Sequence, residues 1–496
     1  MLRVTGPAEP AKRDARAGKR YTAKTLAVEV YSMVQAPTSA PTHDVDVDRL
    51  LEADRAHLIH PLFHPNDHAH PMVVVKGEGA EIIDASGKRY FDALSGLWNV
   101  HVGHGRSELA QAAADQMSTL AFNNNYVGFV NVPSTRLAEK LSEIAYPNLS
   151  AVYFTTGGAE SNESAFKTAR FYWKVQGKPD KVKIISRRWG YHGVTMAAAS
   201  ATGLPAYHRM FAPLVPNFIQ AIGPYRFRCE LEGEGGPRPC TAPNEHDYAA
   251  ELEQTLIEQG PDTVAAILGE PVQGAGGVIV PPDDYWPKLR QIADRHNVLL
   301  IADEVITGFG RTGKWFALDH WNVQPDMMSF AKGITSAYLP LGGVMVSHKV
   351  QDAINGAPAD LKFMHAATYS GHAACCAVGL ANVAIIEREG LVDRAARVGR
   401  WFQNLLRTQL EPMPNVGEVR GIGMMAAVEL VDPNATGSAF YDNAVGLAGR
   451  VIERCVQNGI VPRRVNNTIC MAPPLISTEE QLSRLVDALG EGIRQG

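Results

Sequence analysis

The sequence is poor in cysteine and lacks the spacings and runs that mark several protein classes. It holds six cysteines in 496 residues, with no C-x-x-C pair and no regular spacing. This excludes a disulfide-built miniprotein and favours reduced thiols in a cytoplasmic protein. No stretch reaches the about 18 continuous apolar residues of a membrane helix. The nearest candidate, Ala373–Ile386, contains Asn382 and is better interpreted as a buried helix. We therefore expect no membrane partner.

A large excess of charge is missing as well. Lys and Arg total 47 against 52 Asp and Glu, for a formal net charge of −5, so electrostatics give no reason to expect a nucleic-acid partner. Hydrophobic residues make up 45% and charged residues 20%, which excludes a disordered chain and predicts a sizeable buried core. There is no internal repeat, and the length suggests about two to four domains.

Two segments are expected to lie outside the folded body. Residues 1–24 carry seven basic and two acidic side chains and no apolar stretch, which argues against a secretory signal. We interpret residues 1–45 as a mobile N-terminal tail. The segment Glu230–Pro239 is rich in glycine, proline and charge and predicts a surface insertion.

From about residue 150, short apolar runs alternate with helical stretches such as Glu160–Trp173 and Pro287–His296. The predicted strands are Ala151–Thr155, Lys181–Ser186, Thr263–Leu268, Val298–Ala302, Met327–Phe330 and Val344–Val346. Unbroken apolar strands separated by helices predict an α/β fold whose parallel sheet is covered on both faces. Shorter strand pairs are expected around the turn Gly77–Gly79 and near residues 416–431.

Two reactive side chains directly follow predicted strands. Asp303 ends the apolar run that begins at Leu299, and Lys332 comes just after Met327–Phe330. Ligands of open α/β sheets bind at the carboxyl edge of the strands, so both side chains are expected there. An acid and a lysine in one crevice suit pyridoxal 5′-phosphate (PLP), because the lysine forms a Schiff base and the acid keeps the pyridine nitrogen protonated. The alternative is a surface salt bridge, which the apolar strands before both residues disfavour.

Two glycine-containing turns complete the pattern. Phe154–Glu160 combines a strand, a turn of small residues and a helix start, where free N–H groups can hold a phosphate. Trp189–Gly193 places aromatic residues between glycines, where a ring could stack on a flat cofactor. Taken alone, each segment could also be an ordinary turn with packed side chains.

Together these residues resemble a known family. Asp303–Val305, Gly308–Gly313 and Lys332 are similar to the class III aminotransferases of the fold type I PLP enzymes, and the resemblance runs from about Leu58 to Leu475. It is closest to the ω-amine:pyruvate transaminases, through four motifs in the family's order: G-L-W (Gly96–Trp98), G-Y-H-G (Gly190–Gly193), G-E-P-V-Q-G-A-G-G (Gly269–Gly277) and T-Y-S-G-H (Thr368–His372).

The resemblance implies an architecture and an assembly. A mostly parallel seven-stranded sheet would form a large PLP-binding domain over residues 99–374. A smaller α+β domain would be built from both chain ends, residues 46–98 and 375–496. Such enzymes are homodimers or dimers of dimers with shared active sites. The implied activity is transfer of an amino group from a primary amine or ω-amino acid to pyruvate, with β-alanine, taurine or polyamine transamination as the alternative.

The resemblance also implies roles for single residues, and no metal. Lys332 would form the Schiff base and move the proton, while Asp303 would pair with the pyridine nitrogen. The implied cofactor-binding residues are Gly158, Ala159, Tyr191, His192, Glu270, Asp303, Val305, Lys332 and, from the neighbouring subunit, Thr368. The implied substrate-binding residues are Leu62, Trp98, Tyr191, Arg463 and the neighbouring subunit's Tyr126. Arg463 would pair with the carboxylate of pyruvate, for which a guanidinium is suited.

The chain departs from the family's pattern at three places. Gly157–Asn162 reads G-G-A-E-S-N in place of S-G-S-E-A-N, so two hydroxyls are lost and phosphate binding must rest more on backbone N–H groups. His365–Ala373 lacks the family's glycine, aromatic residue and proline, which could reshape the intersubunit side of the pocket. Arg464 stands beside Arg463 and competes for the role of carboxylate ligand.

Four other interpretations are weaker. Ser329–Lys332 fits S-x-x-K, but the S-D-N and K-T-G elements of that hydrolase class do not occur. Gly421–Ala426 fits a dinucleotide-binding pattern, but a strand-like segment follows it where a helix is required. His60, His64, His68 and His70 could suggest zinc, yet intervening prolines favour a solvated loop. A non-catalytic binding module is opposed by the intact Lys332–Asp303 pair.

Overall fold

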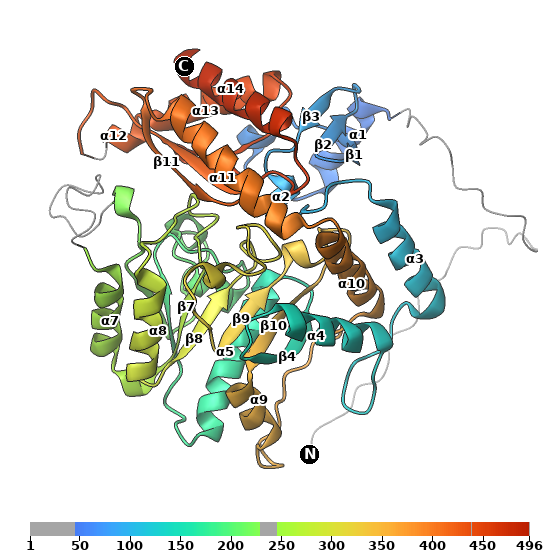
Figure 1. Ribbon diagram of the computed structural model, residues 1–496, viewed down its shortest axis with the longest axis vertical. Helices are drawn as coiled ribbons and strands as arrows, with labels where there is room; N and C mark the ends of the chain where they lie inside the picture. Colours follow the sequence, from blue (N-terminus) through green and yellow to red (C-terminus); the bar gives the residue numbers. More distant parts are fainter. Residues whose placement is uncertain (1–44, 229–245, 438, 496) are drawn as a thin grey trace, which may run out of the picture. The chain divides into compact units, whose positions relative to one another are not determined.

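The computed structural model describes residues 45–228, 246–437 and 439–495 (Figure 1). Four features lie outside the described residues: residues 1–44 of the tail predicted for 1–45, the insertion Glu230–Pro239, and two of the cysteines, Cys229 and Cys240. The chain divides after Leu62 into two compact units. None of the helices in the described ranges is both long and apolar enough to cross a membrane.

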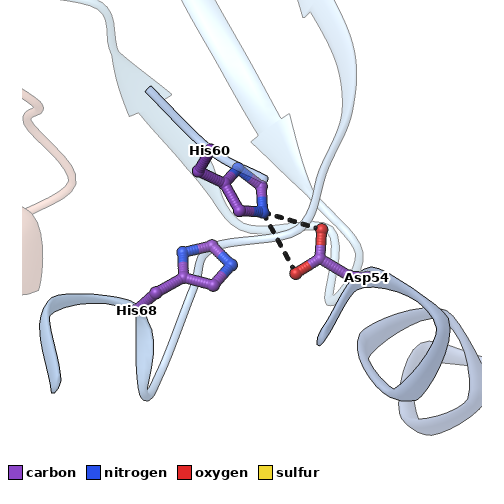
Figure 2. Close-up of side chains that lie close together, drawn as sticks. All are labelled: Asp54, His60 and His68. Atoms are coloured by element: carbon purple, nitrogen blue, oxygen red, sulfur yellow. Dashed lines mark hydrogen bonds and ion pairs between the residues drawn. The ribbon is translucent and has the colours of Figure 1, made fainter. Parts of the chain in front are cut away.

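Within residues 45–62, the described part of the N-terminal unit contains the helix α1 (Val47–His57). Asp46 caps it, because its carboxylate accepts a hydrogen bond from the backbone N–H of Arg49 at 3.1 Å. After the helix the chain folds back, and His60 Nε2 hydrogen-bonds to Asp54 Oδ1 at 3.0 Å (Figure 2). This pair links the helix to the segment that follows it.

The larger unit, from Phe63 onward, is built on a seven-stranded sheet in the order β4-β10-β9-β8-β7-β5-β6. Strand β10 is antiparallel to both of its neighbours, and the other pairs are parallel. The strands are β4 (Leu149–Thr155), β5 (Lys183–Arg187), β6 (Phe218–Ala221), β7 (Val264–Gly269), β8 (Leu299–Asp303), β9 (Met327–Phe330) and β10 (Gly342–Ser347). The predicted α/β fold with a mostly parallel seven-stranded sheet is therefore confirmed.

Alternate residues of the central strands pack on opposite faces of this sheet. Leu299 and Ile301 join a cluster with Trp173 of α5 (Gly158–Val175). Leu300, between them, joins a second cluster that includes Trp286 of α8 (Tyr285–Arg295) and Leu137 of α4 (Val132–Ile144). Burial on both faces explains why these strands are continuous apolar runs.

The larger unit contains further α-helices (Figure 1). They are α2 (Ser95–Trp98), α3 (Ser107–Leu120), α6 (Met196–Ala201), α7 (Tyr248–Gln259), α9 (His348–Asn355), α10 (Ala373–Arg388), α11 (Leu391–Leu410), α12 (Ala439–Asp442), α13 (Ala444–Gln457) and α14 (Glu479–Gln495). The run Ala373–Ile386, interpreted from sequence as a buried helix, lies within α10, and Asn382 is fully buried there.

Two small sheets join distant parts of the chain. One contains β1 (Val74–Glu78), β2 (Glu81–Asp84) and β3 (Arg89–Phe91); the other has the order β11-β12-β14-β13, from β11 (Val416–Ile422), β12 (Met425–Leu430), β13 (Arg463–Val465) and β14 (Thr468–Met471). Phe91 N donates to Gly459 O at 2.8 Å, and Val461 N donates to Phe91 O at 2.9 Å. The predicted domain boundaries remain predictions, but early and late segments do lie side by side.

The glycine pattern at Gly421–Ala426 lies at the hairpin that joins β11 to β12. Gly423 adopts a left-handed φ of 56° in this turn, and the chain continues as a strand. A dinucleotide-binding glycine loop requires a helix at this point. The structure therefore agrees with the conclusion that Gly421–Ala426 is not a dinucleotide-binding loop.

Candidate active site

Asp303 and Lys332 lie at the same edge of the large sheet. Asp303 is the last residue of β8, and Lys332 follows β9 by two residues and begins a short 3-10 helix (Lys332–Ile334). Strands β8 and β9 are parallel neighbours in which Asp303 is paired with Ser329. Both side chains therefore belong to the carboxyl edge, as their positions in the sequence predict.

The carboxylate of Asp303 is buried and surrounded by donors. Its Oδ2 accepts hydrogen bonds from Asn162 Nδ2 and His192 Nδ1, both at 2.7 Å. Its Oδ1 accepts one from Val305 N at 3.1 Å. Only 3% of Asp303 is exposed, so these contacts fix the carboxylate in one orientation.

Burial lowers the pKa of the Lys332 amine, and the nearby charge of Arg463 acts in the same direction, while Asp303 and Glu270 oppose the shift. Glu270 is itself buried, and its carboxylate accepts hydrogen bonds from Tyr191 N at 2.9 Å and Gly274 N at 2.8 Å. Burial raises the pKa of Glu270. A lysine with a lowered pKa spends more time as the neutral amine, the form that acts as a nucleophile or base.

The turn between β4 and α5 provides an anion site. No side chain caps the N-terminus of α5, and the N–H groups of Gly158 and Ala159 bond to none of the described residues. A Cβ placed on Gly158 would lie 2.8 Å from Cγ1 of Val305, so Val305 packs directly against the first turn. Free first-turn N–H groups and the helix dipole favour a phosphate here.

Tyr191 follows β5 near this site, and its ring lies 5.3 Å from that of Tyr207. Burial raises the pKa of its phenol to about 12, while the charge of Arg463 opposes the shift. Trp98 is almost fully buried in a cluster with Ile306 and Met425.

Arg463 and Arg464 lie on opposite sides of β13. Arg464 Nη1 donates to Val445 O of α13 at 3.2 Å. The charge of Arg463, by contrast, acts on Lys332 and Tyr191, and its guanidinium forms no hydrogen bond or ion pair with any residue in the described ranges. The structure therefore distinguishes two arginines that the sequence left in competition.

Three further residues were predicted to belong to the site. Thr368 and Tyr126 are exposed, in segments that meet through the rings of Phe122 and Tyr369 at 5.9 Å. Their assignment to a neighbouring subunit's site stays a prediction. Leu62 ends the N-terminal unit with an exposed side chain, and its place in the substrate pocket also stays a prediction.

Two buried polar residues beside the site were not assigned a role from the sequence. Asn162 donates a hydrogen bond to Asp303. In the sequence, the only feature that could have pointed to this role was the presence of a polar residue one turn into the helix that follows the glycine turn. His101 is fully buried, and a Cβ on Gly333 would lie 2.6 Å from its Cε1. Burial lowers the pKa of His101 well below its usual value, so a neutral ring packs next to Lys332. Its sequence, H-V-G-H, looks like an ordinary loop.

Comparison with known proteins agrees with this geometry. Residues 62–493 match the family described as aminotransferase class-III. The diaminobutyrate–2-oxoglutarate transaminase of Halomonas elongata is 39% identical over 88% of this chain and 94% of its own length. The putrescine–pyruvate aminotransferase of Pseudomonas aeruginosa is 40% identical over 84% and 88%. The ω-transaminase of Pseudomonas jessenii in complex with PMP has a TM-score of 0.84 at 37% identity, covering 90% of this chain and 98% of that one.

The residues present fit the family's cofactor. An uncapped helix N-terminus suits the phosphate, a buried carboxylate suits a protonated pyridine nitrogen, and a lysine of lowered pKa suits the aldehyde. PLP is thus the cofactor, and an amine donor and a 2-oxo acceptor are the substrates. By family match, fold and site chemistry, this chain belongs to the class III aminotransferases.

Proposed function

We propose that the protein is an ω-transaminase that moves an amino group from a primary amine or ω-amino acid to pyruvate. The observation that carries this proposal is the half-buried guanidinium of Arg463, whose charge reaches Lys332 and Tyr191. A 2-oxo acid brings a carboxylate into the site, and a guanidinium without a partner among the described residues can bind it with two parallel hydrogen bonds.

We assign the cofactor's contacts as follows. The N–H groups of Gly158 and Ala159, with Thr368 of a neighbouring subunit, hold the phosphate. Asp303 binds the pyridine nitrogen, and Val305 and Tyr191 lie on the two faces of the ring. His192 supports Asp303 at 2.7 Å, and Glu270 holds the backbone of Tyr191 at 2.9 Å. When bound, PLP supplies an electron sink for the substrate carbon that loses its proton.

Lys332 is the residue to which we assign covalent attachment and proton transfer. Its Nζ takes a proton from the substrate carbon and returns it later, a task that requires the amine to become neutral. Burial makes that form more accessible by lowering the pKa of Lys332. We propose that the substrate pocket is lined by Trp98 and Leu62 of the same subunit and by Tyr126 of a neighbouring subunit.

The proposal is tested with a panel of amine donors against pyruvate, measured as alanine formed. We expect 1-phenylethylamine and ω-amino acids to give alanine, and Lys332→Ala to bind PLP without turnover. A wild-type protein that binds PLP but forms no alanine from any donor would refute the proposal.

A second candidate is a polyamine:2-oxo acid aminotransferase. The 40% identity to a putrescine–pyruvate aminotransferase favours it. The panel therefore includes putrescine and diaminobutyrate, each with pyruvate and with 2-oxoglutarate. A clear preference for putrescine over 1-phenylethylamine would support this alternative, and a preference for 2-oxoglutarate would reject pyruvate as the acceptor.

A further inference from the structure

Asn162 is a buried residue of α5 that contacts two parts of the candidate site. One hydrogen bond runs from its Nδ2 to Asp303 Oδ2 at 2.7 Å, and another runs to His192 O at 2.8 Å. Only 1% of Asn162 is exposed. Both neighbours are acceptors, so the orientation of the amide is determined chemically: if it were reversed, its oxygen would face two other oxygens.

The position of Asn162 along α5 gives this contact a further meaning. The helix begins at Gly158, whose free N–H group belongs to the proposed phosphate site. Asn162 lies four residues later, about 6 Å along the axis, and reaches the carboxylate proposed to bind the pyridine nitrogen. One rigid helix therefore connects the groups that hold the two ends of the cofactor.

Neither of the other two donors to Asp303 provides this connection. Val305 N belongs to the residue two positions after Asp303, so its contact is local. His192 lies in the segment after β5 and contacts Asp303 through its Nδ1. The backbone carbonyl of His192 is in turn bound by Asn162. Removing Asn162 would thus loosen the carboxylate directly and its histidine partner indirectly.

We propose that Asn162 is a positioning residue that holds the carboxylate of Asp303 against the pyridine nitrogen of PLP. This inference rests on the role proposed above for Asp303. If Asn162 has this role, its effect on cofactor binding must depend on the presence of the ring nitrogen. A residue that only stabilises the fold would show no such dependence.

The test compares binding of two cofactors to the apoenzyme: PLP and its 1-deaza analogue, in which carbon replaces the pyridine nitrogen. Wild-type protein should prefer PLP, because only PLP can pair with Asp303. Asn162→Ala should reduce this preference by about tenfold, the typical effect of a hydrogen bond to a charged group. Asp303→Ala should abolish the preference with either residue at position 162.

Thr168→Val is the matched control. Thr168 is equally buried on α5, and its hydroxyl bonds to the helix's own carbonyl at Ser164, at 2.7 Å. This variant should leave the cofactor preference unchanged. If Asn162→Ala fails to fold, Asn162→Ser, which retains one donor, should show a smaller loss of preference.

Equal weakening of both cofactors by Asn162→Ala or Asn162→Ser, with the preference unchanged, would overturn the proposal and leave Asn162 a purely structural residue. Retention of the preference in Asp303→Ala would instead refute the role of Asp303 itself. Both measurements use cofactor binding and no amine donor, so they are independent of the substrate proposed for the enzyme.

Discussion

At the scale of single residues, neighbours of identical charge have different surroundings. Arg463 and Arg464 are adjacent on β13, where side chains alternate between the two faces. One guanidinium acts on Lys332 and Tyr191, and the other bonds to the backbone of Val445. Strand geometry therefore decides which of the two arginines acts on Lys332, and this is the arginine that we propose binds the substrate carboxylate.

We predict that Arg463→Ala raises the KM for pyruvate and for alanine by about 10- to 100-fold, because a charge-assisted pair with the carboxylate is lost. The KM for 1-phenylethylamine, which has no carboxylate, should change far less. Steady-state kinetics with each substrate varied in turn measures the difference.

Arg464→Ala is the matched control for this prediction, since it removes the same charge one residue away. It should leave both substrate classes near wild-type values. Equal losses for pyruvate and 1-phenylethylamine in Arg463→Ala would contradict the assigned role.

At the scale of elements, the turn between β4 and α5 is shaped by close packing. Gly157 and Gly158 are adjacent, yet a Cβ on Gly157 meets nothing within 4 Å, whereas one on Gly158 would lie 2.8 Å from Val305. The backbone φ of Gly157 is 178°, an extended value that any residue adopts. The two glycines should therefore differ sharply in their tolerance of a side chain.

We predict that Gly158→Ala weakens PLP binding by roughly tenfold, because the new methyl group displaces the stiff side chain of Val305 from the position proposed for it on the cofactor's face. Gly157→Ala should bind PLP nearly as well as the wild type. Titration of each apoenzyme with PLP, followed by absorbance, gives the two affinities; indistinguishable affinities would argue against the packing explanation.

At the scale of the whole molecule, apolar side chains are exposed on two segments of the larger unit, residues 126–130 and 361–369. Val127 is fully exposed and Val130 is 77% exposed, and the neighbouring 361–369 segment adds Met364 and Tyr369. Exposed apolar groups gathered in this way are typical of a protein–protein interface. The predicted neighbour is a second copy of the chain, since Tyr126 and Thr368 belong to the same segments.

We predict a dimer in solution that Val127→Lys weakens by at least about tenfold, because a twofold interface would bury one new charge from each copy. Ile257→Lys is the control. Ile257 is exposed on α7, which contacts β6, the edge strand at the other end of the sheet from β4, so this variant should leave the dimer intact. Sedimentation across a concentration series distinguishes the variants, and a monomeric wild type would contradict the predicted assembly.

Some short elements were not predicted because they give no clear apolar run. Strand β6 reads F-I-Q-A and β13 reads R-R-V, whereas β9, which is also four residues long, is the more apolar run M-M-S-F and was predicted. Asn162 and His101 were missed for a different reason: their importance lies in contacts with residues 141 and 232 positions away, Asp303 and Gly333. No local pattern carries that information.

The sequence by itself determined the fold class, the cofactor chemistry and the Asp303–Lys332 pair. It could do so because continuous apolar strands imply a parallel sheet, and residues that follow such strands must share its carboxyl edge. Only the tertiary structure decided which arginine acts on Lys332, what holds Asp303 in place and why a side chain at Gly158 would collide with Val305. Those answers depend on which distant segments pack together, and packing is a property of the folded chain as a whole.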